Sequence, residues 1–244
     1  MIIEKQAGGT SMKPQRTKAR LVFAVAVLLG VSSVVGTARA VPLADLVDGA
    51  SITVLDKRFF DWTLLDTSLS EENLAFIDVT ALADQPGNPG LRFTVSQDVL
   101  TSADGSIVDL SFEFRVGAPG ATIKDNSLAL VDYEVAGSGA VSIFEDVYAS
   151  GGNLLASKFV FADSVDQQLL DTTEFAGQQT LTIQKFIRVG TEGEAGDFAA
   201  IRVFDQRFSQ TTVTEPAMLA LLGIGLAGLA LGGRRSSRRN DADL

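Results

Sequence analysis

The sequence contains no cysteine and no histidine in its 244 residues. Without cysteine the chain cannot form disulfides, thiol nucleophiles or thiolate metal sites. Without histidine it lacks the commonest metal ligand and general base, and neither a Ser-His-Asp nor a Cys-His mechanism is available. These absences exclude the main nucleophilic hydrolases, and they leave the fold dependent on a hydrophobic core.

Positive charge is scarce in the central part of the chain. Between Val41 and Pro216 there are 27 Asp and Glu against 10 Lys and Arg, a net charge of −17, whereas the whole chain carries −10 because both of its ends are basic. Nucleic-acid binding needs a basic surface, so we expect no nucleic-acid partner. An acidic surface suits an extracellular protein, where it aids solubility or holds divalent cations.

Motifs that carry known chemistry are also missing. The sequence has no phosphate-binding loop, HExxH or EF-hand spacing, and no SxxK or GxSxG nucleophile motif. A carboxylate pair of the glycosidase type is the remaining catalytic option. The acidic residues available for it are Glu113, Asp132, Glu134, Glu145 and Asp146. Their context distinguishes none of them, so we expect the protein not to be an enzyme and to need no cofactor.

Loop carboxylates are the weak candidates for a metal site. Calcium can be held by aspartates together with backbone carbonyl oxygens. Asp104, Asp163 and Asp166 lie in segments expected to be loops, which makes them the candidates for calcium.

Residues 1–40 are typical of a secretory signal peptide. Lys13, Arg16, Lys18 and Arg20 form a basic region, and the apolar segment 21–35 follows it. Ala38 and Ala40 form a small-x-small cleavage site, so we expect cleavage after Ala40. An uncleaved membrane anchor is the alternative. Met12 directly precedes the basic region, so residues 1–11 are either upstream of the true start or a long n-region.

The segment that follows contains many short stretches rich in Gly, Pro, Asn and Asp, which predict turns, and the residues between them have the pattern of strands. In residues 109–116 every second side chain is apolar, which places one face of a strand in the core and the other in water. Residues 181–189 show the same alternation, interrupted by Lys185, and so do residues 129–135. A short helical pattern occurs near residues 43–47. We therefore predict an all-β fold, an antiparallel β-sandwich of jelly-roll type with nine or ten strands, over residues 41–210.

One internal echo links the two ends of this domain. Residues 52–59 and 201–208 share the pattern Ile-x-Val-x-Asp-x-Arg-Phe. Two interpretations are open: chance convergence on a common strand pattern, which we favour, and two strands that pair across one sheet. Trp62 is predicted to be a core anchor. The aromatic residues are few and unclustered along the sequence, which argues against a sugar-stacking surface.

The C-terminal part has three successive elements. The polar residues Thr214, Glu215 and Pro216 precede an uncharged apolar run, 217–233, of 17 residues. As a helix this run would rise about 25 Å, enough to cross a bilayer with local thinning, so we expect a single transmembrane helix there. Four arginines close the segment and would hold that end in the cytoplasm. They are Arg234, Arg235, Arg238 and Arg239.

This ordered set resembles the sorting segment of the PEP-CTERM family of exported bacterial proteins. Glu215 and Pro216 match the family's Pro-Glu-Pro motif, and Thr214 stands where its first proline is expected. The resemblance implies an exosortase-like partner that cuts near the motif, a membrane-anchored stage at the inner membrane, and bacteria that make extracellular polysaccharide. It covers residues 211–239 and leaves 240–244 as a polar tail.

Together these observations predict an exported protein of the cell surface, envelope or biofilm matrix with a structural or adhesive role. A carbohydrate-binding module associated with exopolysaccharide is the alternative, and an envelope hydrolase is a third hypothesis, disfavoured by the missing nucleophile and base.

Overall fold

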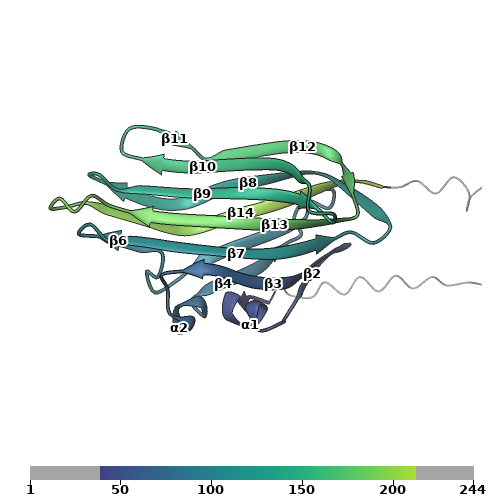
Figure 1. Cartoon of the computed structure of the whole chain (residues 1–244), viewed down its shortest axis with the longest axis horizontal. Helices are drawn as coiled ribbons and strands as arrows, with labels where there is room; N and C mark the ends of the chain where they lie inside the picture. The colour runs from purple at the N-terminus through teal and green to yellow at the C-terminus, as the bar shows by residue number, and fades with distance from the viewer. Residues whose placement is uncertain (1–38, 213–244) are drawn as a thin grey trace, which may run out of the picture. The chain divides into compact units, whose positions relative to one another are not determined.

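A computed structural model describes residues 39–212 of the chain. They form two antiparallel sheets that face each other as a β-sandwich (Figure 1). In spatial order, sheet A contains β1 (Val41–Pro42), β4 (Ile77–Leu82), β5 (Gly90–Val95), β14 (Phe198–Thr212), β8 (Ala121–Ala136) and β12 (Leu170–Gln178), with β6 (Thr101–Ala103) also paired to β14. Sheet B contains β11 (Gln167–Gln168), β10 (Leu154–Asp163), β9 (Ala140–Ala149), β13 (Thr180–Gly190), β7 (Ile107–Gly117), β3 (Lys57–Thr67) and β2 (Ile52–Val54). The expected antiparallel β-sandwich is confirmed.

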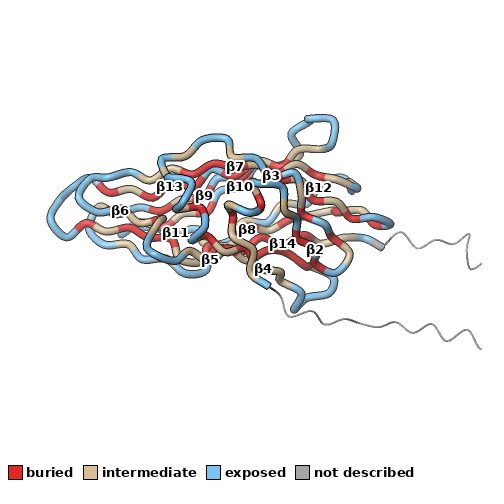
Figure 2. Tube along the Cα trace, turned by 90° about the horizontal axis from the view of Figure 1, so that it is seen from below, coloured by how far each residue is buried: buried red, intermediate tan, exposed pale blue. Residues whose placement is uncertain are grey.

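The alternation in β7 and β13 has the predicted structural meaning. Phe112 and Phe114 are fully buried, whereas Glu113 between them lies on the outer face of sheet B. Ser111 shares that outer face but is only 8% exposed, because its hydroxyl donates to the Asp66 carbonyl oxygen on β3, at 3.1 Å. Buried and exposed residues alternate in the same way along most strands (Figure 2).

The prediction that Ala129 and Val131 face the core is wrong. Leu128 and Leu130 face the core, and Val131 is 48% exposed. Residues 128–131 are all apolar, so the sequence alone is compatible with either face. The register against β14, which shifts near Ile201 and Val203, selects the face.

The two echo segments do not pair, which leaves chance convergence as the interpretation of their shared pattern. The first copy is not one strand: it folds back on itself as the hairpin of β2 and β3 in sheet B, with Leu55 in a left-handed conformation at the turn. The second copy lies in β14, in sheet A. The shared pattern therefore encodes two different local structures.

Two short helices accompany the strands. The helix α1 (Leu43–Val47) lies where the sequence predicts it and buries Leu43 and Leu46, whereas α2 (Glu71–Leu74) is not predicted. Residues 39–212 contain fourteen strands instead of nine or ten, because four of them have only two or three residues.

Aromatic side chains fill the part of the core between β3 and β7 on one side and β5 and β14 on the other. The Trp62 ring lies 4.4 Å from that of Phe114, and the Phe93 and Phe204 rings are also 4.4 Å apart. Trp62 is only 4% exposed, as expected of a core anchor. This aromatic half of the core comprises Phe59, Trp62, Phe93, Phe112, Phe114, Phe204 and Phe208.

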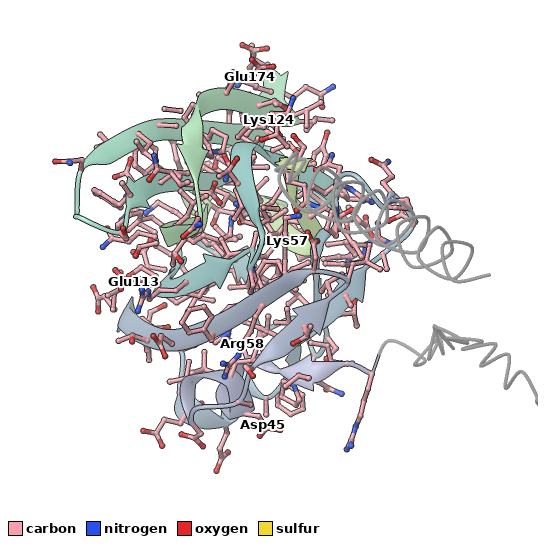
Figure 3. All side chains as sticks on the ribbon, turned by 90° about the vertical axis from the view of Figure 1, so that its right-hand side faces the viewer. Asp45, Lys57, Arg58, Glu113, Lys124 and Glu174 are labelled. Carbon is pink, nitrogen blue, oxygen red and sulfur yellow. The ribbon has the colours of Figure 1, made fainter. Side chains whose placement is uncertain are left out.

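One lysine at the start of β3 is buried between the sheets. Lys57 donates to the Gln210 side-chain oxygen on β14 at 2.6 Å and to Asp56 at 3.4 Å. Figure 3 shows Lys57 among the interior side chains, whereas Glu113 projects from the outside of the ribbon. Burial lowers the pKa of Lys57, and Asp56 opposes part of that shift.

The predicted targeting segments lie almost entirely outside the described residues. Ala40 is described and directly precedes β1. The rest of the signal peptide, the motif at 214–216, the apolar run and the four arginines fall outside. Within residues 39–212, no helix has the length and apolar character needed to span a bilayer.

Candidate functional site

Three phenylalanines form a row on the outer face of sheet B. Phe186 on β13 is the register partner of Phe144 on β9, which is the partner of Phe159 on β10. Their exposed fractions are 40%, 37% and 41%, respectively. The Phe144 and Phe186 rings lie 6.0 Å apart, and Phe161 stacks on Phe159 at 5.3 Å. We call Phe144, Phe159 and Phe186 the aromatic row.

The aromatic row overturns the reading of the aromatic residues as unclustered. Its members come from three strands, of which β9 and β10 are consecutive and β13 lies further along the chain. Strand pairing alone brings them together, because neighbouring strands lie only about 4.8 Å apart. The available signal was their phase, because each occupies an outward position in a strand whose inward positions, apart from Glu145, Lys158 and Lys185, are apolar.

An ion pair and a hollow flank the aromatic row on one side. Arg188 donates to both carboxylate oxygens of Asp109, at 2.7 and 3.1 Å, and these hydrogen bonds raise the pKa of Arg188. Both side chains remain accessible to solvent. The pair borders a hollow of about 320 Å³ whose lining also includes Phe144, Phe186 and Ser142. Ring faces and charged hydrogen-bonding groups are therefore presented together.

Polar side chains flank the aromatic row on the other side. Gln184 donates to Glu113 at 2.7 Å, and Ser157 donates to Asp146 at 2.5 Å. The Tyr148 hydroxyl also donates to Asp146, at 3.3 Å. Burial raises the pKa of this phenol, and the negative charge of Asp146 raises it further. An apolar strip with hydrogen-bonding groups on both sides can hold a ligand that offers C–H surfaces and hydroxyl groups.

A second group of polar residues lies inside the sandwich. Glu145 on β9 is the register partner of Lys158 on β10 and of Lys185 on β13, and its carboxylate contacts the Nζ atoms of both. Asn126 reaches this group from β8 in the opposite sheet and donates to Glu145 at 2.6 Å. At most 1% of any of these four residues is exposed. We call Asn126, Glu145, Lys158 and Lys185 the charged cluster.

Burial and mutual attraction compete within the charged cluster. Burial alone would raise the pKa of Glu145, but the charges of Lys185 and Lys158 outweigh it and lower that pKa. Burial lowers the pKa of Lys185, and Glu145 opposes only part of the shift. Lys185 interrupts the apolar alternation of residues 181–189. Lys158 and Glu145 likewise occupy inward positions, and that shared phase was the missed signal.

The three calcium candidates do not converge. Asp163 and Asp166 share one turn after β10, in which the Asp163 carboxylate accepts from the backbone N–H groups of Val165 and Asp166 and its pKa is lowered by these bonds. Asp104 occupies a different turn, between β6 and β7, in a left-handed conformation. Among residues 39–212 no group of three or more acidic side chains is placed to hold a metal ion.

The five candidate catalytic carboxylates are also dispersed. Glu145 is sealed in the charged cluster, whereas Glu113 and Asp146 lie on the outer face of sheet B. Asp132 and Glu134 lie on β8, where Glu134 pairs with Arg202 at 3.0 Å.

Comparison with known sequences identifies the C-terminal segment. Residues 212–239 match the PEP-CTERM protein-sorting motif, which confirms the resemblance drawn from the motif, the apolar run and the arginines. The motif implies an exported protein. No curated protein matches the chain.

Several solved structures align with the sandwich at low similarity. TmCBM61 in complex with β-1,4-galactotriose is 14% identical, covering 59% of this chain and 86% of that chain, with a TM-score of 0.26. A CBM4 structure is 11% identical over 62% and 86%, with a TM-score of 0.28, and the mannan-recognising TmCBM27 is 6% identical over 72% and 97%, with a TM-score of 0.29. At these TM-scores the alignments carry no argument about function.

Proposed function

We propose that this chain is an exported envelope or matrix protein whose β-sandwich binds extracellular polysaccharide on the outer face of sheet B. The observation that carries the proposal is the aromatic row with its polar flanks. Pyranose rings present C–H faces that pack on aromatic rings, and their hydroxyl groups need the donors and acceptors that flank the row. The role is adhesive and not catalytic, in keeping with the dispersed carboxylates.

The sorting motif supports the location of this activity. In this proposal an N-terminal signal peptide directs export, and the C-terminal segment holds the protein at the inner membrane until an exosortase-like enzyme processes it near Glu215. The net charge of −17 between Val41 and Pro216 suits a solvated extracellular surface. The polysaccharide ligand would then be met outside the cell.

A glycan array with the exported protein tests the proposal. We expect binding to at least one extracellular polysaccharide, and we expect Phe144→Ala combined with Phe186→Ala to weaken it at least tenfold, which corresponds to a loss of about 1.4 kcal/mol. Phe76→Ala is the matched control, because Phe76 is 38% exposed but lies outside the row. It should leave the affinity unchanged.

Two results would contradict the proposal. Binding that survives loss of the two ring faces would place the ligand elsewhere on the protein. The absence of binding to every glycan tested would leave a structural role at the envelope, which is the alternative reading of an exported β-sandwich.

A further inference from the structure

The charged cluster holds a lysine, an asparagine and a glutamate in an arrangement that an ordinary ion pair does not need. Lys158 Nζ contacts Asn126 Oδ1 and lies 3.0 Å from Glu145 Oε1. The same carboxylate oxygen accepts a hydrogen bond from Asn126 Nδ2, at 2.6 Å. One oxygen atom therefore touches both the amine of Lys158 and the amide nitrogen of Asn126.

The proton count of the cluster favours one uncharged lysine. With all groups ionised, two ammonium groups would face a single carboxylate, and a buried charge without a partner is strongly destabilising. Lys185 contacts Glu145 Oε2 and Lys158 contacts Glu145 Oε1, but one carboxylate balances only one positive charge. One of the two amines is then least costly to bury as a neutral group, and a neutral amine is the nucleophilic form of lysine. Of the two, Lys158 is the one that contacts Asn126.

We propose that Lys158 and Asn126 become joined by an intramolecular isopeptide bond, with Glu145 relaying the proton. The lone pair of Lys158 Nζ attacks Asn126 Cγ, and the new Nζ–Cγ bond forms as the carbonyl π electrons move to Oδ1. Glu145 Oε1 takes a proton from Nζ and passes it to Nδ2. The Cγ–Nδ2 bond then breaks, and the nitrogen leaves as ammonia.

The step balances without an oxidant, a cofactor or water. An amine and a primary amide become a secondary amide and ammonia, and Glu145 ends as the carboxylate that it was at the start. The positions of the three groups are fixed by strand register and by burial, so the reacting atoms are held together without a bound ligand. Exclusion of solvent also removes water as a competing nucleophile.

The bond would link the two sheets covalently. Asn126 belongs to β8 in sheet A, and Lys158 belongs to β10 in sheet B. A chain without cysteine has no disulfide for this purpose. A covalent loop closure restricts the unfolded chain in the same way as a disulfide does, and it does so in a form that reductants cannot break.

Peptide mass spectrometry of the exported full-length protein tests the proposal, because Lys158 is the only trypsin site between Lys124 and Lys185. An unlinked chain yields peptides 125–158 and 159–185. A linked chain resists cleavage at Lys158 and yields one peptide, 125–185, lighter by one ammonia than its sequence mass. A missed cleavage has the full mass, and a succinimide at an asparagine loses ammonia but leaves Lys158 cleavable.

Three variants assign the bond to its residues. Asn126→Ala should restore cleavage at Lys158 completely, and Glu145→Gln should reduce the linked fraction at least tenfold while both reacting groups remain. Asn153→Ala is the matched control, since Asn153 is an exposed asparagine in the same peptide, and it should leave the linked peptide unchanged.

The wild-type digest decides the matter even where a variant fails to fold. Complete release of 125–158 and 159–185 at their sequence masses would overturn the proposal. A linked peptide that persists in Asn126→Ala would overturn the assignment of the acceptor, and an undiminished linked fraction in Glu145→Gln would overturn the role of Glu145.

Discussion

The two halves of the sandwich core differ in their side chains: one contains aromatic rings, and the other contains buried charged groups. Between β3, β7, β5 and β14 the space is filled by aromatic rings, whereas between β8, β9, β10 and β13 it holds the charged cluster. Both halves are sealed from solvent and both lie on strands with the same alternation. The difference is that the aromatic half contributes stability simply by leaving water, while each charged group must find a partner.

The two halves of the core therefore have different roles: one contributes hydrophobic packing, and the other determines the register of the strands. Apolar side chains of suitable size can replace one another in a core, but a carboxylate between two lysines tolerates only one register of β9, β10 and β13. A one-residue slip in any of these strands would place the charge on the wrong face. The charged cluster therefore fixes how the strands align, and the aromatic half supplies most of the hydrophobic burial.

The largest expected effect lies in the aromatic half. Phe112→Ala removes a fully buried ring that contacts Trp62 and Phe93, so we expect the free energy of unfolding to fall by about 3–5 kcal/mol. Glu113→Ala, its neighbour on the outer face, should change it by less than about 0.5 kcal/mol. Chemical denaturation of both variants provides the measurement, and equal effects would show that the two faces of β7 are misassigned.

A smaller effect is expected in the charged half. Glu145→Gln keeps the shape of the side chain but leaves Lys158 and Lys185 without a carboxylate, so between unlinked chains we expect a loss of about 1–3 kcal/mol at neutral pH. Glu134→Gln is the control, because its pair with Arg202 is solvent-exposed and contributes less than about 1 kcal/mol. If both variants unfolded at the same denaturant concentration, burial would not distinguish the cluster from a surface ion pair.

The smallest effect is the part of the pH dependence that Glu145 contributes. The pKa of Glu145 is lowered from 4.5 in the folded protein, so the folded state binds fewer protons than the unfolded state in this range. The stabilisation is therefore fully present above pH 4.5 and is lost as the pH falls through the folded pKa. Denaturation between neutral and acidic pH should show this loss in the wild type, and Glu145→Gln should show a smaller loss, because the lowered pKa values of Asp84, Asp163 and Asp197 still act in the variant. An unchanged slope in that variant would assign the acid sensitivity to other carboxylates.

The sequence was sufficient wherever one strand alone determined the outcome. Alternation in β7 identified the buried face, and the pattern near Leu43 identified a short helix. The sequence was insufficient where two strands had to be paired. The apolar residues 128–131 fit either face, and the echo segments share one pattern although they lie in different sheets.

Both functional features depend on pairing, which explains why they were missed. Phe144 and Glu145 are adjacent in the sequence, yet one belongs to the aromatic row outside the sheet and the other to the charged cluster inside it. The role of each residue depends on its register partners on β10 and β13. Local patterning gives the face of a side chain, but only strand register gives its neighbours.

The position of β14 has a consequence for how the protein emerges from a cell. This last strand has 15 residues, lies between β5 and β8, and also pairs with β6. Export that delivers the N-terminus first would expose those three strands before their common partner arrives, and pairings between distant segments form slowly. The sorting motif begins at residue 212, where β14 ends. The chain would therefore complete sheet A only as the sorting segment reaches the membrane, so that maturation of the fold and recognition of the tail coincide in time.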